Sequence, residues 1–191
     1  MSGSGGAECT IEEYISQLEK CVALHPYAVI LREKDMDRQD YRELAGRVQR
    51  ICREASAKMF VHSDISAAEY AGCANVHFSM EHFKQMCSEQ DDKIKKLDCV
   101  SVSCHSVEEA AYAAHAGADQ IVLGTIFETQ CKPGKTGAGL GFLKEVCIVV
   151  HGINPNVKVF AIGGIKPDNI EKVIDAGADG GCMMSWFMEH I

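Results

Sequence analysis

The sequence predicts an α/β fold in which parallel strands alternate with helices that lie outside the sheet. Short, continuous apolar runs recur along the chain with segments of helical periodicity between them, which is typical of strands buried on both faces. The tetrapeptide Ala-Gly-Ala-Asp occurs at 116–119 and at 176–179, each time between a predicted helix and the strand that it feeds. This repetition suits an eight-fold barrel, with a doubly wound sheet as the competing interpretation.

A helix, a strand and a second helix are predicted first. Thr10 can N-cap a helix over 10–24, and Glu13 three residues later completes a capping box. The run 28–34 is apolar and then polar, as expected of a buried strand whose carboxyl end reaches solvent. The segment 39–55 has an apolar residue every three or four positions, which indicates a helix face.

The same alternation continues through the middle of the chain. Apolar runs predict strands at 58–62 and 75–80, with a short helix over 66–71 between them. A polar segment over 81–97 is predicted to be helical, and 99–103 is the next strand.

Ser106 can N-cap an Ala-rich helix over 107–116, and the long apolar run 119–127 that follows predicts a strand. A loop rich in Gly, Lys and Thr over 128–139 separates this strand from a helix over 140–151.

The last predicted elements are a strand at 157–162, a helix over 167–176 that begins with a favourable proline, and a strand at 181–185. No linker or low-complexity segment interrupts the pattern. Residues 9–191 are therefore predicted to form one domain, after a disordered Gly/Ser-rich segment over 1–8.

The composition argues against several classes of function. The formal charge is −8 and no basic run occurs, which argues against nucleic acid as the main partner. No apolar stretch is long enough for a membrane span, and the start of the chain lacks the features of a secretory signal. A cytoplasmic location is the expectation that follows.

The chain has ten cysteines, and no pair shows C-x-x-C spacing. Zinc and redox motifs need close pairs, so the sequence predicts neither a metal site nor a redox site. Most of the cysteines lie inside apolar segments, where a reduced thiol packs as a small hydrophobic group.

Polar residues follow the predicted strands at their carboxyl ends, where barrels form their sites. The candidate site residues are Arg32, Lys34, His62, Ser103, His105, Thr125, Thr129, Lys132, Gly163, Gly164 and Ser185. Cations and hydroxyls donate hydrogen bonds, and glycine exposes backbone N–H groups, so this set predicts a phosphate site. The turn Gly163-Gly164 together with Ser185 resembles the phosphate cup between the last two strands of such a barrel, and a tight turn without a ligand is the alternative.

Four segments at separate strand ends carry a family resemblance: ILREK at 30–34, VSCHSVEEA at 102–110, GTIFETQCK at 124–132 and AIGGI at 161–165. They resemble, in order and spacing, the signatures of thiamine phosphate synthases and bacterial thiazole tautomerases. The match runs from about residue 9 to 187. The resemblance implies a TIM (β/α)8-type barrel with the first strand missing or degenerate and the last helix truncated.

The same resemblance implies roles for single residues. Arg32 and Lys34 match a basic pair that contacts the pyrimidine diphosphate, and Gly164 and Ser185 match the turns that hold the thiazole phosphate. Ser103, Thr129 and Lys132 match further positions in contact with ligand. A phosphorylated thiazole or pyrimidine is therefore the expected small-molecule partner.

The chain departs from the synthase pattern where Mg²⁺ would bind. The synthase has Asn-Asp and a further Asp at these positions, and this chain has His62-Ser63 and His82. Because Mg²⁺ prefers carboxylate oxygen, no metal site is predicted, and Mg²⁺ is a cofactor only if the synthase interpretation holds. Ile30 also replaces an expected glutamine.

The chain departs from the tautomerase pattern at the acid/base histidine, which is Thr125 here. A threonine hydroxyl cannot exchange protons near neutral pH as imidazole does. His62 is the main candidate to replace it, with Lys132 and Thr125 as further catalytic candidates, and His105 is a weaker substitute. His77 lies inside a strand and is predicted to be a satisfied core histidine.

Three functions remain open from the sequence. The first is a thiamine biosynthesis enzyme that acts on thiazole phosphate as the tautomerase does. The second is a thiamine phosphate synthase, and the third is a non-catalytic barrel that binds a phosphorylated ligand. The missing first strand would leave strand edges open, so a homo-oligomer is also among the expectations.

Overall fold

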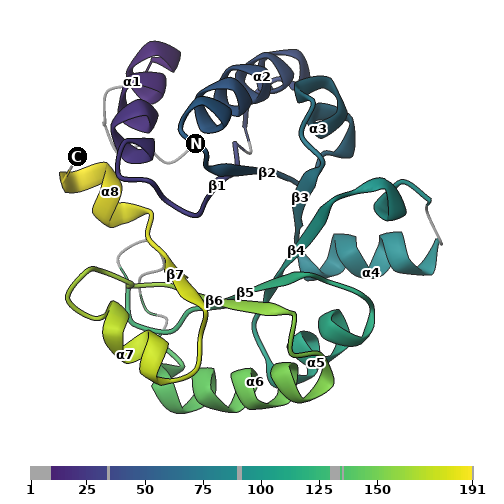
Figure 1. The fold of residues 1–191 in the computed structure, drawn as a ribbon, viewed down its shortest axis with the longest axis vertical. Coiled ribbons are helices and arrows are strands. Elements are labelled where there is room, and N and C mark those ends of the chain that lie inside the picture. Colours follow the sequence, from purple (N-terminus) through teal and green to yellow (C-terminus); the bar gives the residue numbers. More distant parts are fainter. Residues whose placement is uncertain (1–9, 34, 90–91, 130–133, 135, 191) are drawn as a thin grey trace.

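Seven parallel strands form one sheet in sequential order from β1 to β7, and the sheet curls into an incomplete ring with helices around its outside (Figure 1). The computed structural model describes residues 10–33, 35–89, 92–129, 134 and 136–190. A doubly wound sheet would reverse its strand order at one point, and this sheet does not. The fold is therefore of the TIM-barrel type, as predicted.

The strands are β1 Ala28–Leu31, β2 Lys58–His62, β3 Asn75–Phe78, β4 Cys99–Cys104, β5 Gln120–Gly124, β6 Lys158–Ile162 and β7 Gly180–Cys182. The helices are α1 Ile11–Val22, α2 Arg38–Glu54, α3 Ile65–Ala71, α4 Met80–Ser88, α5 Val107–His115, α6 Gly139–Ile153, α7 Ile170–Asp175 and α8 Ser185–His190. A 3-10 turn, Ile94–Lys96, precedes β4.

The ring is open between β7 and β1, which do not pair with each other in the sheet. Helices α1 and α8 lie side by side at this opening (Figure 1), and Gln17 Nε2 donates a hydrogen bond of 3.0 Å to the carbonyl of Phe187. Residues 1–9, where the first strand of the family would lie, are outside the described residues, so its loss stays a prediction, and α8 is a short final helix. A homo-oligomer that covers this opening stays a prediction.

Tyr27 links the two sides of the opening inside the ring. Its ring stacks on Phe160 of β6 with 5.4 Å between centroids, and its hydroxyl accepts hydrogen bonds from Gln120 (2.9 Å) and Lys58 (3.3 Å). A residue that precedes β1 thus contacts β2, β5 and β6. Side chains, rather than strand pairing, join these parts of the interior.

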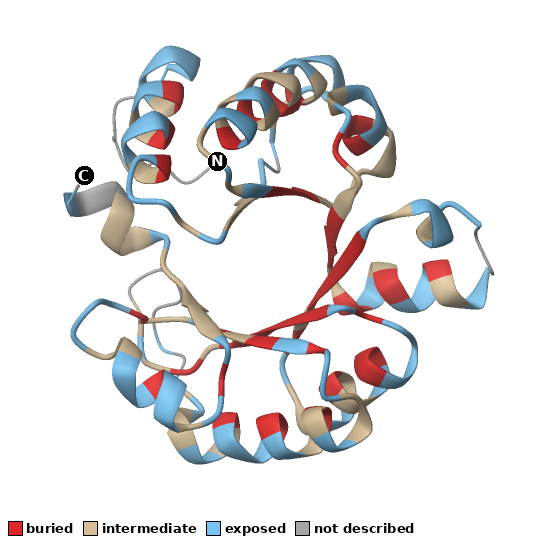
Figure 2. Ribbon diagram, viewed as in Figure 1, coloured by how far each residue is buried: buried red, intermediate tan, exposed pale blue. Residues whose placement is uncertain are grey.

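The main core lies between the sheet and the surrounding helices. Figure 2 shows the buried residues on the strands and on the helix faces turned toward them. Leu44 and Val48 of α2, and Leu143 and Val146 of α6, are at most 3% exposed. The spacing of three or four residues that predicts these helices also places their apolar side chains on one face.

The two copies of the Ala-Gly-Ala-Asp sequence form the same local structure. Gly117 and Gly177 adopt positive φ angles of 91° and 100° just after their helices, where a residue without a side chain is favoured. The carboxylate of Asp119 then accepts the backbone N–H of Val100 at 2.7 Å, and that of Asp179 accepts the N–H of Val159 at 2.9 Å. Each repeat therefore ties the start of one strand to its neighbour.

Replacing Asp179 with asparagine is expected to lower stability by about 1–2 kcal/mol at neutral pH, because Lys158 Nζ lies 2.7 Å from its carboxylate. Burial alone would raise the pKa of Asp179, but the hydrogen bonds from Lys158 and Val159 outweigh it and lower the pKa. A lowered folded-state pKa gives stability that is present above the unfolded pKa of about 3.9 and is lost as the pH falls through the folded value. Urea unfolding of both proteins should show the difference shrinking at acidic pH.

Asp175→Asn is the matched control, because this carboxylate is exposed at the end of α7. It should leave the free energy of unfolding within about 0.5 kcal/mol of the original at every pH. A difference for Asp179→Asn that persists unchanged at low pH would contradict the assignment.

Several predicted boundaries were wrong. The helix predicted over 81–97 ends at Ser88, and the one predicted over 167–176 begins only at Ile170. In the second case the side chain of Asn169 accepts the N–H of Lys166 and donates to the carbonyl of Gly164, which holds a turn before the helix. The strands predicted at 28–34, 75–80, 119–127 and 181–185 are also shorter than expected.

The eight described cysteines are free thiols, and five of them are buried. Burial raises the pKa of Cys52 and Cys147 to about 11, so these thiols stay protonated at neutral pH. The prediction of reduced core cysteines is confirmed for this part of the chain, and Cys9 and Cys131 lie outside the described residues. No described helix is long and apolar enough to cross a membrane.

Candidate functional site

The carboxyl ends of the strands gather the predicted site residues at one edge of the ring. The register pairs Leu31 with Val61, His62 with His77, and His77 with Ser101. Because neighbours in register point to the same face, His62, His77 and Ser101 all face the interior. Ser103 follows on the same face two residues later, and Arg32 comes directly after β1.

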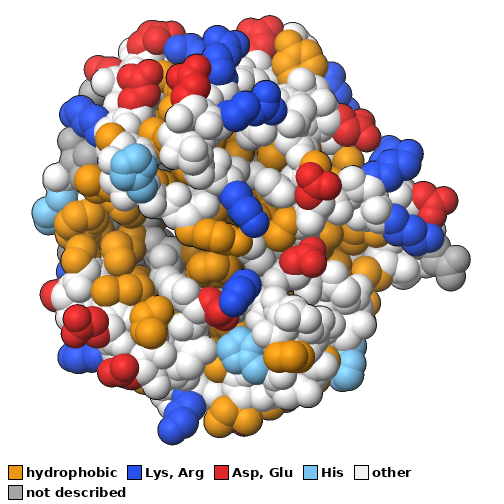
Figure 3. Space-filling view, viewed as in Figure 1, with side chains coloured by type: hydrophobic (Ala, Val, Ile, Leu, Met, Phe, Trp, Pro, Cys, Tyr) orange, Lys and Arg blue, Asp and Glu red, His pale blue; other side chains and the backbone are white. Residues whose placement is uncertain are grey.

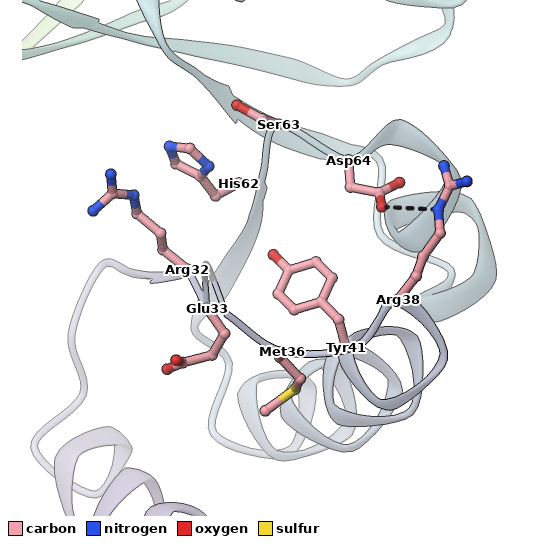
Figure 4. Close-up of a pocket in the computed structure, with 8 residues that line it drawn as sticks. All are labelled: Arg32, Glu33, Met36, Arg38, Tyr41, His62, Ser63 and Asp64. Atoms are coloured by element: carbon pink, nitrogen blue, oxygen red, sulfur yellow. Dashed lines mark ion pairs between the residues drawn. The ribbon is translucent and has the colours of Figure 1, made fainter. Parts of the chain in front are cut away.

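A pocket of about 240 Å³ opens beside this edge (Figure 4). It is lined by Arg32, Glu33, Met36, Arg38, Tyr41, His62, Ser63 and Asp64. Arg32 and His62 extend to the same side in this view, whereas the Arg38 guanidinium turns to Asp64, with 3.8 Å between Nε and Oδ2. On the face seen in Figure 3, hydrophobic side chains with Lys or Arg side chains among them occupy the middle of the molecule.

Ser63 lines the pocket, although it is not among the site residues predicted from the sequence. Its φ of 56° lies in the left-handed region, and its N–H donates to the carbonyl of His77 at 2.9 Å. Its buried hydroxyl has no hydrogen-bond partner among the described residues, although it lines the pocket. A buried hydroxyl without a partner is costly unless a ligand or water completes it. The sequence feature that could have predicted Ser63 is its position directly after β2.

His77 is buried and hydrogen-bonded, as predicted for a satisfied core histidine. Nδ1 lies 2.8 Å from Ser101 Oγ and Nε2 lies 2.8 Å from Ser103 Oγ. Burial, with smaller contributions from the nearby charges of His62 and Arg32, lowers the pKa of His77 to about 3. It is therefore neutral at physiological pH. Its ring lies 5.7 Å from that of His62, measured between centroids.

The turn Gly163-Gly164 lies at the same edge, after β6. The φ angles are 99° and 63°, and a Cβ on Gly163 would come within 2.5 Å of Thr125 Cγ2. A Cβ on Gly164 would come within 2.7 Å of the carbonyl oxygen of Glu128. Glycine is therefore required here by the backbone conformation and by close packing on the chain after β5.

The backbone N–H groups of this turn are candidate donors to a ligand. Within the described part of the chain, the backbone N–H groups of Gly163 and Gly164 have no hydrogen-bond acceptor. The register of Ile162 with Cys182 brings the turn next to the segment that follows β7, where Ser185 begins α8. Two N–H donors and a neighbouring hydroxyl are suited to a phosphate group.

Other candidate residues at the same edge differ in exposure and in the contacts that they make. His105 is exposed after β4, and its Nδ1 donates to the carbonyl of Gly124 at 2.5 Å, because a carbonyl can only accept. Thr125 follows Gly124 and packs on Gly163. Thr129 lies in the loop after β5. The predicted residues Lys34 and Lys132 lie outside the described residues.

The residues at the Mg²⁺ positions do not fit that metal. The described residues contain no group of three or more His, Cys, Asp or Glu side chains arranged to hold a metal ion. Asp64 is the nearest carboxylate, and its oxygens already accept the Ala67 N–H at 2.8 Å and pair with Arg38. His82 is on α4 with its ring against Phe78. The positions that hold Mg²⁺ in the synthase pattern thus carry imidazole and hydroxyl groups, which are poor ligands for this metal.

Comparison with known proteins gives the family. The sequence model of a family described as thiamine monophosphate synthase matches residues 5–187. A putative thiamine-phosphate synthase 2 of Aquifex aeolicus is 31% identical over 181 residues, which cover 93% of this chain and 91% of that protein. A thiamine-phosphate synthase of Geobacillus thermodenitrificans is 33% identical over 190 residues, which cover 96% and 80%.

The fold has a counterpart among solved structures. The thiamine phosphate pyrophosphorylase of Pyrococcus furiosus superimposes with a TM-score of 0.73 at 22% identity, over 90% of this chain and 79% of that one. This likeness supports the barrel fold, and the sequence matches support the family independently. With its four motifs at the strand ends and a match along nearly its whole length, the chain belongs to the thiamine monophosphate synthase family.

Proposed function

We propose that the chain is a thiamine phosphate synthase that binds both substrates at the carboxyl edge of its sheet. In this reaction a C–N bond forms between the methylene carbon of the pyrimidine diphosphate and the thiazole nitrogen, while the C–O bond to the diphosphate breaks and pyrophosphate leaves. The observation that carries the proposal is the glycine turn beside Ser185, where the N–H groups of Gly163 and Gly164 have no acceptor among the described residues. They are suited to the phosphate of the thiazole substrate.

A second group of donors supports a site for the diphosphate. Arg32, His62 and Ser103 lie at the ends of β1, β2 and β4, on the same edge as the glycine turn. A guanidinium and a hydroxyl donate the charge-assisted hydrogen bonds that phosphate oxygens accept. The curated relatives named thiamine-phosphate synthase, at 31% and 33% identity, favour this reaction over others on the same fold.

The test is turnover by the purified full chain. It is incubated with hydroxymethylpyrimidine diphosphate and thiazole phosphate, with and without Mg²⁺, and thiamine phosphate and pyrophosphate are measured as products. Formation of both in equal amounts supports the proposal. Absence of product in both conditions, with Aquifex aeolicus or Geobacillus thermodenitrificans protein active in parallel, would overturn it.

A non-catalytic phosphate-binding barrel is the second candidate, and the altered metal positions favour it. His62, Ser63 and His82 replace the carboxylates and amide of the synthase pattern, whereas the glycine turn is retained. Binding of thiazole phosphate in calorimetry without any turnover would support this candidate.

The tautomerase reaction is the third candidate, and it stays a prediction. It needs a group that exchanges protons near the thiazole, and Thr125 packs against Gly163 where that group is expected. His62 is on the opposite side of the ring's edge, at the end of β2. Aromatisation of the thiazole tautomer that is lost in His62→Ala would support this candidate.

Mg²⁺ alone is expected to leave the protein unchanged, because no described carboxylate cluster is present to bind it. At about 5 mM Mg²⁺ the melting temperature should shift by less than about 1 °C. The doubly substituted variant Ser63→Asp, His82→Asp restores carboxylates at the positions that the synthase uses, and it should gain a Mg²⁺-dependent rise. A rise of several degrees in the unmodified protein would contradict the absence of a metal site.

A further inference from the structure

Three hydrogen-bonded side chains cross the interior face of the sheet. His77 on β3 pairs in register with Ser101 on β4, so both side chains point into the ring, and Ser103 lies two residues further toward the carboxyl edge. His77 Nδ1 lies 2.8 Å from Ser101 Oγ, and its Nε2 lies 2.8 Å from Ser103 Oγ. The imidazole therefore links a deeply buried hydroxyl to one at the candidate site.

The protonation state of His77 limits how the hydrogen bonds of Ser101, His77 and Ser103 can be directed. The ring is 4% exposed, and burial together with the charges of His62 and Arg32 lowers its pKa to about 3. A neutral imidazole has one N–H donor and one acceptor nitrogen. Either Nδ1 donates to Ser101 while Nε2 accepts from Ser103, or Nδ1 accepts from Ser101 while Nε2 donates to Ser103.

The burial of Ser101 distinguishes the two arrangements. Ser101 is 1% exposed, and His77 is the only hydrogen-bond partner of its hydroxyl among the described residues. If Nδ1 carried the proton, the hydroxyl proton of Ser101 would be buried with no acceptor among the described residues, which is unfavourable. If Nε2 carries the proton, Ser101 donates to Nδ1 and Nε2 donates to Ser103 Oγ, so both protons have an acceptor.

We infer that Ser101 and His77 form a relay that fixes the Ser103 hydroxyl as a hydrogen-bond donor to an anionic ligand. Because Ser103 Oγ accepts the proton of Nε2, its own proton is left for a group outside the relay. Ser103 is only partly buried, at the edge where Arg32 also lies. Ser101 and His77 act through Ser103, so they are positioning residues. The anionic ligand in this inference rests on the proposed function.

The relay has a direct readout that needs no ligand. Long-range ¹⁵N correlation spectra of the imidazole rings distinguish the two neutral tautomers from the imidazolium. We expect His77 to be neutral with its proton on Nε2 at pH 7, and the Nδ1 resonance to shift in Ser101→Ala, because that variant removes the donor to Nδ1. A proton on Nδ1 or a charged ring in the unmodified protein would overturn the relay.

Binding of inorganic pyrophosphate, measured by calorimetry, tests the consequence. Ser101→Ala should weaken binding by roughly 3- to 10-fold although Ser101 does not reach the ligand, and Ser101→Cys, which keeps a weak donor, should recover part of the loss. Ser88→Ala, an exposed serine on α4, should bind as the unmodified protein does. Equal affinity in Ser101→Ala, with melting curves that show it folded, would overturn the inference.

Pyrophosphate binding and the tautomer of His77 test two different statements. If the unmodified protein bound no pyrophosphate, the proposed function and the anionic ligand of Ser103 would fail together. The tautomer measurement would still decide whether Ser101 and His77 form the relay.

Discussion

Gly163→Ala is expected to lower the free energy of unfolding by about 2–5 kcal/mol, the largest effect of any single methyl group proposed for this chain. The φ of 99° is unfavourable for any residue with a side chain, and the added Cβ would lie 2.5 Å from Thr125 Cγ2 and 3.0 Å from Thr125 Cα. The backbone must move to relieve the contact, so the N–H groups of the turn would also leave their positions. Urea unfolding and calorimetry with inorganic phosphate measure the two effects.

Gly141→Ala is the matched control for the glycine turn. Gly141 lies in α6, and a Cβ there meets nothing within 4 Å. Because alanine favours a helix over glycine, this variant should gain up to about 1 kcal/mol and bind phosphate unchanged. If Gly163→Ala were as stable as the unmodified protein, the close packing of β6 on the chain after β5 would not be what requires glycine.

Arg32→Met is expected to weaken pyrophosphate binding by roughly 10- to 150-fold, with little change in stability. A hydrogen bond to a charged group contributes about 1.5–3 kcal/mol, which corresponds to this range. Arg32 is exposed and lines the pocket beside His62, so its removal leaves the core intact (Figure 4). Calorimetry gives the dissociation constant, and thermal melting checks the fold.

The control for Arg32 must carry the same change in net charge. Arg50→Met meets this need, because Arg50 is exposed on the outer helix α2. Its affinity for pyrophosphate should stay within about twofold at 0.15 M salt, where distant surface charges are screened. Equal losses in the two variants would show that only overall charge matters, and the proposed diphosphate site would be wrong.

Most of the architecture follows from features within short stretches of sequence. The capping box of Thr10 and Glu13 forms as predicted, and so does the cap of α5 by Ser106. The alternation of apolar runs and helical periods gives seven strands in sequential order. Boundaries failed where a side chain stabilises a competing turn, as Asn169 does before α7.

The candidate site was predicted less completely. Strand-end positions predicted Arg32, His62 and the glycine turn, and the structure places them at one edge because parallel strands end there together. Strand-end position alone did not distinguish Ser63 from its neighbour His62. Its left-handed backbone and its buried, unpartnered hydroxyl depend on how β2 meets α3 and β3, and no local pattern records them.

The sequence by itself determined the order of elements, the barrel class and the residues at the strand ends, since each depends on periodicity or turn chemistry within a few residues. The tertiary structure alone decided which of these residues form hydrogen bonds or pack against each other. His77 meets Ser103, 26 positions along the chain, and Tyr27 meets Gln120, 93 positions along it. Such contacts are set by the register of neighbouring strands and by burial, which together fix the neutral state of His77 and the acceptor for each buried proton.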